Sequence, residues 1–345
     1  MTISVRRARY ESESQELIDA LQANLPHLPH SLLFPWLYLN NPAGQAFAWV
    51  ATDSETERII GIAAAFPRRI LYRGEEVRSY VLGDFCIDTA HRSLGVALTL
   101  QRACLEGLFK EDSGFAVDFP SRTMLAVYKR MQIDANATMI RYAKPLRADR
   151  KVNEHVPVRA IARGISAVVN AGLRLRDSSM KGAGDWMIAA DRGPWGEEFT
   201  QATRQWSPGT GVCVLRTADY LNWRYREHPT QSYEMLAARQ GGKLRGYLIL
   251  HMSGEDCTVD DLMADDDEVR GILLAEATSL GRERRIHTLS VPGLSTHPGS
   301  QLLEKCGFRP RESSPVVLMA LPRPAQRQIG AANDQWYLTS GDWES

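Results

Sequence analysis

The chain has 345 residues, 44% hydrophobic and 24% charged, a composition typical of a folded protein with about two domains and not of a disordered or fibrous one. Its 41 basic and 41 acidic side chains cancel. No strong field is therefore available to hold a nucleic acid or an anionic membrane by charge alone. The longest apolar run, residues 59–66, is far shorter than the ~20 residues of a membrane-spanning helix, so we expect no stable membrane insertion.

The five cysteines, at positions 86, 104, 213, 257 and 306, stand apart in apolar surroundings. Their odd number argues against a disulfide framework, and no Cys/His spacing fits a zinc site. The first ten residues lack the apolar core of a signal peptide. We therefore expect reduced buried thiols, Cys86 included, no metal and a cytoplasmic location.

Hydrophobic periodicity over the first 148 residues predicts the order β-α-β-β-β-α-β-α-β. The expected elements are a strand at 3–10, a helix at 11–25, strands at 46–53, 59–73 and 77–88, a helix at 94–110, a strand at 114–120, a helix from Ser121 and a strand at 138–146. A meander of three strands followed by crossovers indicates a mixed α/β sheet rather than an all-parallel one.

Residues 149–212 differ in character and predict a helical linker. The stretch 158–177 has apolar residues at near-helical spacing with arginines between them, and 197–206 predicts a short helix. A basic amphipathic helix could lie on a membrane surface, but this one has no aromatic anchor, which favours packing between domains.

A second αβ pattern begins at about residue 213 and repeats the order seen at the end of the first. Its expected elements are strands at 233–239, 244–253 and 257–264, a helix at 268–285, a strand at 287–293, a short helix ending near Phe308 and a strand at 316–321. We therefore predict two related domains, 1–148 and 213–345, joined by the linker 149–212.

The stretch HRSLGVA, residues 91–97, follows a predicted strand and opens a predicted helix. A helix N-terminus presents unpaired N–H groups and attracts anions. Gly95 allows close approach of a ligand to the backbone, and Arg92 adds a positive charge. A single glycine before a helix is also common where no phosphate binds, so these residues alone leave both interpretations open.

The wider stretch DFCIDTAHRSLGVALTLQRACL resembles motif A of the GCN5-related N-acetyltransferase (GNAT) superfamily, whose loop is Arg/Gln-x-x-Gly-x-Gly/Ala. Arg92, Gly95 and Ala97 fill its three defined places. The resemblance implies that the loop N–H groups bind the pyrophosphate of acetyl-CoA or another acyl-CoA, and that the backbone near Ile87 pairs with the pantetheine. The implied cofactor-binding residues are Ile87, Arg92, Ser93, Leu94, Gly95, Val96, Ala97 and Ser121.

Downstream, SRTMLAVYKRMQI resembles the family's Asn-x-x-Ala-x-x-x-Tyr-x-x-x-Gly-Phe helix. Tyr128 stands at the tyrosine, which the resemblance implies protonates the leaving thiolate, although it could instead be a solvent-facing helix residue. Ser121 holds the asparagine place, where its hydroxyl can cap the helix. The pattern departs at Met124, which replaces a small residue, and at Gln132-Ile133, which replace Gly-Phe.

The second half resembles the same fold in a degenerate form. LLEKCGF keeps the Gly-Phe ending but has Leu303 in the tyrosine place. The stretch from Val259 to Leu274 has no glycine before its helix and several acids, which repel a pyrophosphate. The whole resembles a tandem GNAT protein of mycothiol-synthase-like architecture. YLNWRYREHP and WYLTSGD also resemble bacterial tandem GNAT proteins found with polysaccharide biosynthesis enzymes, which suggests an amino sugar or sugar nucleotide as acceptor.

Acyl transfer to an amine needs a base, and Asp84 is the candidate. Burial in the apolar GDFCI setting would raise the pKa of its carboxyl towards a useful value. Asp84 could instead accept hydrogen bonds from a neighbouring loop, with water as the base.

Other polar residues carry weaker hypotheses. Asp260-Asp261 and the acids 265–267 fit no calcium loop, so we expect a solvated turn before a helix. His27 and His30 could line an acceptor cleft, but a loop position is favoured. The run 223–225, Trp-Arg-Tyr, could stack on a sugar or pack between domains.

Three functions remain open from the sequence. The first is an acyl-CoA-dependent N-acyltransferase in which the second half shapes the cleft for a small-molecule or sugar amine. The second is a catalytically inactive acyl-CoA-binding or scaffold protein. The third, a transferase that uses charged tRNA, would need a basic groove, against which the balanced charge argues. Nothing in the sequence specifies the acceptor, the acyl chain length or the oligomeric state.

Overall fold

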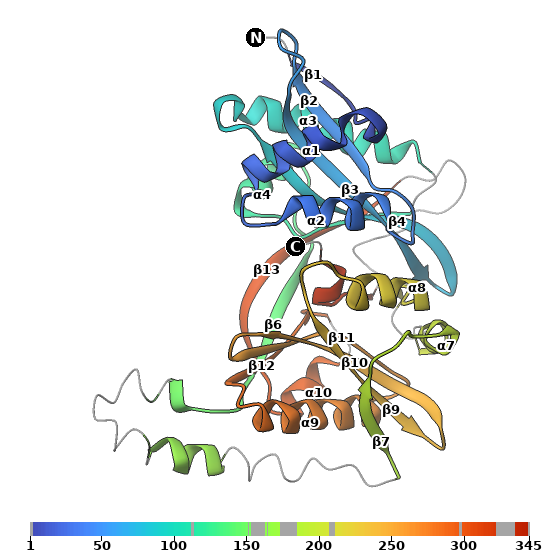
Figure 1. Ribbon diagram of the computed structural model, residues 1–345, viewed down its shortest axis with the longest axis vertical. Helices are drawn as coiled ribbons and strands as arrows, with labels where there is room; N and C mark the ends of the chain where they lie inside the picture. Colours follow the sequence, from blue (N-terminus) through green and yellow to red (C-terminus); the bar gives the residue numbers. More distant parts are fainter. Residues whose placement is uncertain are drawn as a thin grey trace.

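The computed structural model describes residues 3–111, 114–150, 152, 163, 165–172, 185–206, 211–296, 299–321 and 335–343. Figure 1 shows two stacked halves, with the long strands β6 and β13 running between them. The architecture is a mixed α/β sheet, as predicted, whose strand order is β1-β2-β3-β4-β5-β13-β6-β12-β11-β10-β9-β7.

The first half follows the predicted order closely, because its central strands are nearly continuous buried runs and the buried residues of α3 lie on one face of the helix. Its elements are β1 (Ile3–Arg7), α1 (Tyr10–Asn24), α2 (His30–Phe34), η1 (Pro35–Leu39), β2 (Phe47–Asp53), β3 (Ile59–Tyr72), β4 (Glu75–Ile87), η2 (Thr89–His91), α3 (Leu94–Phe109), β5 (Phe115–Asp118), α4 (Arg122–Arg130) and β6 (Ala137–Pro145). The sequence did not predict α2 or the π-helical turn η1, which lie in and just after the proline-rich loop.

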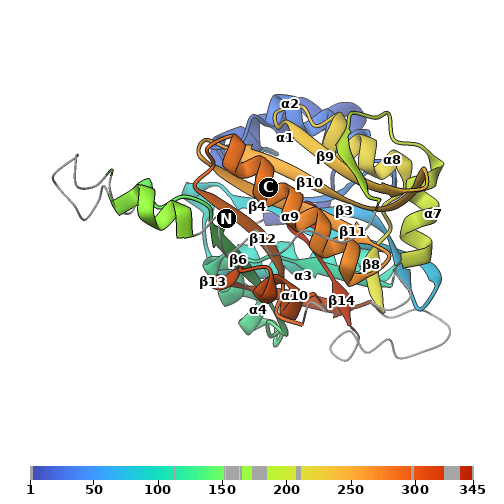
Figure 2. The same cartoon turned by 90° about the horizontal axis from the view of Figure 1, so that it is seen from below.

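The second half repeats this order. Its elements are β7 (Met187–Asp191), α7 (Glu197–Trp206), β8 (Val212–Val214), α8 (Ala218–Leu221), η4 (Asn222–Arg226), β9 (Tyr233–Gln240), β10 (Lys243–Ser253), β11 (Asp256–Ala264), α9 (Asp267–Glu283), β12 (Thr288–Leu294), α10 (Ser300–Lys305), β13 (Arg309–Ala320), β14 (Trp336–Tyr337) and η5 (Ser340–Asp342). Helix α9 lies across strands β9, β10 and β11, and Figure 2 shows it from below.

The predicted linker contains more than helix. Its predicted helix at 197–206 is confirmed as α7, and residues 165–172 are helical within the predicted 158–177, most of which lies outside the described residues. Strand β7, which we did not predict, pairs antiparallel with β9 at the edge of the sheet. The domain boundaries at 148 and 213 stay a prediction.

The two halves exchange their last strands. Strand β6, the last element of the first half, pairs antiparallel with β12 of the second. Strand β13, near the end of the second half, pairs antiparallel with β5 of the first, and β6 and β13 pair with each other. Each half therefore completes its sheet with a strand from the other.

A pair of stacked tryptophans also joins the two halves. The rings of Trp36 and Trp223 stack 4.5 Å apart, and each indole N–H donates to the other residue's carbonyl, at 2.9 and 3.1 Å. Both side chains are buried. Of residues 223–225, Trp223 thus packs between the halves, one of the two roles that the sequence left open.

Candidate active site

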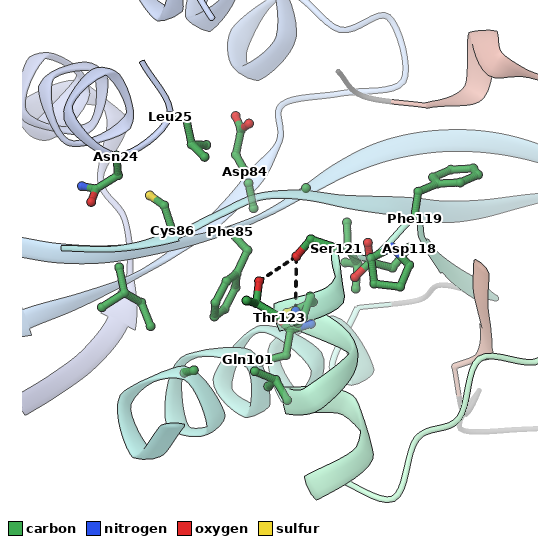
Figure 3. Close-up of a pocket in the computed structure, with 18 of the residues that line it drawn as sticks. Asn24, Leu25, Asp84, Phe85, Cys86, Gln101, Asp118, Phe119, Ser121 and Thr123 are labelled. Atoms are coloured by element: carbon green, nitrogen blue, oxygen red, sulfur yellow. Dashed lines mark hydrogen bonds between the residues drawn. The ribbon is translucent and has the colours of Figure 1, made fainter. Parts of the chain in front are cut away.

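A cavity opens where β4 and β5 separate. The two strands are hydrogen-bonded in parallel only between Ser79–Val81 and Phe115–Val117. Beyond this point β4 runs on to Ile87 while β5 ends at Asp118, and the wedge between them holds a cavity of 680 Å³. Its walls come from β4, the α1–α2 loop and the N-terminal ends of α3 and α4, as Figure 3 shows in part. This volume lies within the usual range for a small-molecule site.

The N-terminus of α3 lies at the outer end of the cavity. Ser93 caps the helix, because its Oγ accepts a hydrogen bond from the Val96 N–H at 3.3 Å. Arg92 folds back and donates to the carbonyl of Ile87 at 3.2 Å, so that both residues line the cavity together with Ser93, Leu94 and Ala97. The first N–H groups of a 16-residue helix have no acceptor within it and face this end.

Gly95 leaves open space at this helix end. A Cβ built on it would meet only the Ser93 Oγ, at 4.0 Å, and its φ is not in the left-handed region. Neither packing nor backbone conformation therefore requires a glycine here. The free space lies above the exposed turn, where a ligand could approach the backbone.

Asp84 lies on a bulge in the middle of the cavity wall. The register of β4 against β3 shifts between Ile62 and Ala64, so that Asp84 and Phe85 stand opposite one residue. Asp84 has a φ of +47°, a left-handed conformation that aspartate tolerates better than most residues. The bulge turns its carboxylate to the side of β4 on which Asn24 and Leu25 lie, as Figure 3 shows.

Tyr38 holds this carboxylate. Its hydroxyl donates to the Asp84 Oδ2 at 2.7 Å. Burial raises the pKa of the Asp84 carboxyl, against the opposing effects of this hydrogen bond and of the nearby His30 and His27. His27 lies in the α1–α2 loop and lines the cavity, whereas His30 is buried, with its Nε2 3.0 Å from the Leu25 carbonyl.

Tyr128 stands behind the cavity wall. It is fully buried, and its hydroxyl donates to the Asp118 Oδ2 and accepts from the Gln101 Nε2 at 3.1 Å. Asp118 and Gln101 line the cavity, whereas Tyr128 does not. Burial raises the pKa of Asp118 to about 6, against hydrogen bonds from Tyr128 and the Phe119 N–H. The alternative of a solvent-facing Tyr128 is wrong.

Helix α4 begins after Ser121, as the sequence predicted. The Ser121 Oγ accepts from the Met124 N–H at 3.2 Å and caps the helix, and Ser121 also lines the cavity. At the other end Gln132 has a φ of +60° and the Ile133 N–H donates to the Tyr128 carbonyl. Gln132 thus adopts the left-handed turn that glycine favours, which is how the helix ends without the Gly-Phe pair.

The equivalent wedge of the second half is filled. Strands β11 and β12 are paired only between Asp256–Thr258 and Thr288–Ser290 before they separate. The segment 335–343 enters this opening: Thr339 bridges to Gly293, and the Tyr337 hydroxyl donates to the Leu262 carbonyl. The cavity that remains there measures 10 Å³.

Buried charge fixes this segment. Arg216, with no exposed surface, donates to the Asp261 Oδ2 at 3.0 Å and to the Asp342 Oδ2 at 2.8 Å. The Tyr225 hydroxyl donates to Asp261 at 3.3 Å. The expected solvated turn at Asp260-Asp261 is therefore wrong: both lie on β11 and are buried, because Arg216 and Ser340 provide partners within the fold. The later acids do open a helix, with Asp266 as the cap of α9.

Among the described residues, no group of three or more His, Cys, Asp or Glu side chains is placed to hold a metal ion. The described helices include none long and apolar enough to cross a membrane.

Known structures share this architecture. No protein-family model matches the chain, and no curated protein matches its sequence. A probable N-acyltransferase from Enterococcus faecalis superposes with a TM-score of 0.69 over 93% of this chain and 73% of its own, at 12% identity. A GCN5-related N-acetyltransferase from Anabaena variabilis gives 0.66 over the same shares, at 13% identity. The fold is that of the GCN5-related N-acetyltransferases.

A third similar structure is the N-myristoyltransferase of Saccharomyces cerevisiae with bound myristoyl-CoA. It has a TM-score of 0.57 and covers 93% of this chain and 84% of its own, at 11% identity. At these identities the likeness concerns the fold.

The structure brings most of the predicted site residues together. Those that line the cavity are Asp84, Ile87, Arg92, Ser93, Leu94, Ala97 and Ser121. Gly95 and Val96 lie in the first turn of α3 beside them.

Three residues of the cavity region, Tyr38, Asp118 and Trp343, were not predicted from the sequence. For Tyr38 a signal exists, since WLYLNNP and WRYREHP share the pattern Trp-x-Tyr-x-x-x-Pro and place Tyr38 and Tyr225 on equivalent aspartates.

Proposed function

We propose that the protein is an acyl-CoA-dependent N-acyltransferase that transfers its acyl group directly to an amine in a ternary complex. The observation that carries the proposal is the wedge between β4 and β5, which has a helix N-terminus at one end and the Asp84 carboxylate in its wall. A long cofactor with phosphates at one end and a thioester at the other fits such a wedge.

The outer end would hold the phosphates. Backbone N–H groups at the start of α3 and the Arg92 guanidinium are the donors there, and the helix dipole favours negative charge. The pantetheine would run along β4, whose edge has no partner strand beyond Val81 on the β5 side. This course brings the thioester towards Asp84.

The chemistry requires two proton transfers. The amine nitrogen forms a bond to the thioester carbon, the carbon–sulfur bond breaks, and the amine loses a proton while the thiolate gains one. Asp84 is the proposed base, since its raised pKa and its position in the wall suit proton removal from an ammonium. Tyr128 is the proposed acid, and it reaches the cavity through Asp118.

The acceptor end favours an amine without phosphates. Of the described residues that line the cavity, Arg92 is the one that carries a permanent positive charge, and it lies at the cofactor end. A sugar nucleotide would bring a second pyrophosphate with no matching cation. An amino sugar or another uncharged body bearing an amino group fits this lining better.

An inactive acyl-CoA-binding protein is the second candidate. The burial of Tyr128 behind Asp118 favours it, because the hydroxyl does not itself meet the cavity. In that case the cofactor would bind and Tyr128→Phe would change nothing measurable beyond stability.

Calorimetric titration with acetyl-CoA tests the proposal, with Gly95→Glu as the variant. We expect saturable binding at one site per chain, lost in the variant because a carboxylate then occupies the anion site. Gly172→Glu, a substitution in open space far along the chain, is the matched control and should bind like the unmodified protein. Absence of binding by the unmodified protein would overturn the acyl-CoA assignment.

A further inference from the structure

Two half-exposed aromatic rings form one end of the cavity. Phe119 follows β5 and Trp343 belongs to the segment 335–343, yet their rings stack 5.3 Å apart at an interplanar angle of 23°. Both line the cavity of the first half. Residues more than 200 positions apart in sequence thus build a single apolar wall.

The second half holds Trp343 in place. The Arg224 guanidinium donates to the carbonyls of Gly341 and Trp343, each at 2.8 Å. Asp342, between them, is held by Arg216. Arg224 is buried, and Gly341 lies so close to Tyr225 that a Cβ there would be 1.9 Å from the Tyr225 hydroxyl oxygen. The backbone on which Trp343 stands is therefore rigidly fixed by side chains outside the cavity.

The aromatic wall lies on the side where the amine must enter. Phe119 comes just after the point at which β4 and β5 separate, whereas Arg92 and the start of α3 lie beyond the far end of β4. In Figure 3, Phe119 and Asp84 project to one side of β4, and Gln101 and Thr123 lie on the other. A cofactor bound at α3 would leave the space between Asp84 and the two rings for the acceptor.

We propose that Trp343, together with Phe119, is the specificity-determining wall for the acceptor and selects amines that carry a flat apolar face beside the amino group. This inference rests on the proposed acyltransferase function. A flat face can come from an aromatic ring or from the C–H face of a sugar, and both stack on an indole. The carboxylate of Asp84 in the same cavity complements the ammonium of either.

The test compares three amines with acetyl-CoA as donor: 2-phenylethylamine, glucosamine and n-butylamine, which has no flat face. Release of the coenzyme A thiol gives kcat/KM for each. We expect Trp343→Ala to lower kcat/KM for at least one flat amine about three- to tenfold more than for n-butylamine, the size of a lost stacking contact. Trp343→Phe keeps a ring and should retain most of the preference.

Two further variants test whether the effect belongs to the aromatic wall. Phe119→Leu changes the same wall from the first half and should shift the preference in the same direction. Phe109→Ala removes a 41% exposed ring outside the cavity and should leave the preference unchanged. Acetyl-CoA binding by calorimetry shows which variants are folded.

The outcomes separate the two claims. Loss of preference for glucosamine alone or for 2-phenylethylamine alone supports the wall and identifies the kind of face. An equal fall for all three amines in both Trp343→Ala and Phe119→Leu, with acetyl-CoA still bound, overturns the wall but not the acyltransferase. Failure of the unmodified protein to bind acetyl-CoA or to release thiol with any amine overturns both.

Discussion

The two halves of the molecule place an aspartate at the same point of the same fold and use it differently. In each half the tyrosine of a Trp-x-Tyr turn donates a hydrogen bond to an aspartate: Tyr38 to Asp84, and Tyr225 to Asp261. Each aspartate lies at or beside a bulge in the strand that borders the wedge. Asp84 faces a cavity of 680 Å³, whereas Asp261 faces Arg216 and a wedge filled by residues 335–343.

The difference shows what turns a structural carboxylate into a candidate base. Position in the fold is not sufficient, since both aspartates are buried enough for their pKa to be raised. A fixed cation within hydrogen-bond distance of Asp261 opposes the effect of burial on its pKa and ties this carboxylate to the fold. Asp84, paired only with a neutral hydroxyl, remains free to exchange a proton with a ligand.

The largest effect should come from breaking the ion network of the second half. Arg216→Met leaves Asp261 and Asp342 buried without their counter-charge, which costs about 3–5 kcal/mol of unfolding free energy. Guanidinium denaturation measures it. Adding Asp261→Asn and Asp342→Asn to Arg216→Met should recover most of the loss. A loss below about 1 kcal/mol in the single variant would mean that these carboxylates find other partners.

The corresponding change in the first half should affect rate rather than stability. Asp84→Asn keeps an oxygen that accepts from Tyr38 but removes the proposed base, so we expect acyl transfer to slow by about 10²–10⁴-fold with acetyl-CoA binding retained. Asp134→Asn, an exposed site outside the cavity, serves as the control. An unchanged rate in Asp84→Asn would assign the base to water.

A smaller, pH-dependent effect is expected at Asp118. Its pKa, raised from 3.8 to about 6 by burial, means that the folded state binds a proton more tightly than the unfolded state. Stability therefore falls as pH rises from about 4 to about 6 and is level above that. Asp118→Asn cannot ionise, so its stability relative to the unmodified protein should rise over this window, by about 3 kcal/mol at most.

Urea denaturation of both proteins at pH 4, 5, 6 and 7 gives the comparison for Asp118. Thr123→Ala, another cavity residue but without a titrating group, should show no such trend. A difference that is independent of pH would place the Asp118 pKa close to its unfolded value.

Sequence patterns predicted most elements and most of the residues that line the α3 end of the cavity. Apolar runs between turn residues located most of the strands, and the Ser93 and Ser121 caps stand at the starts of α3 and α4, since capping depends only on nearby residues. The turn η1 at Pro35 was not predicted, although proline is well tolerated in the first turn of a helix.

Contacts between distant segments could not be predicted. Arg224 donates to the Trp343 carbonyl and so positions Trp343 at the cavity of the first half, and Ser340 donates to the buried Asp260. Neither contact leaves a pattern in the local sequence. The position of Tyr128 behind Asp118 depends on how α4 packs on the sheet. The order of elements also does not predict that β6 pairs with the second half and β13 with the first.

The exchange of β6 and β13 has a consequence for how the chain folds. During synthesis β6 emerges long before β12 and β13, the strands that will bind both of its edges, and until then β5 also has an open edge on its β13 side. Pairings between residues this far apart in sequence close slowly, and open edges invite association with other chains. The two halves therefore complete their sheets together, and a chain divided between them would yield two incomplete sheets.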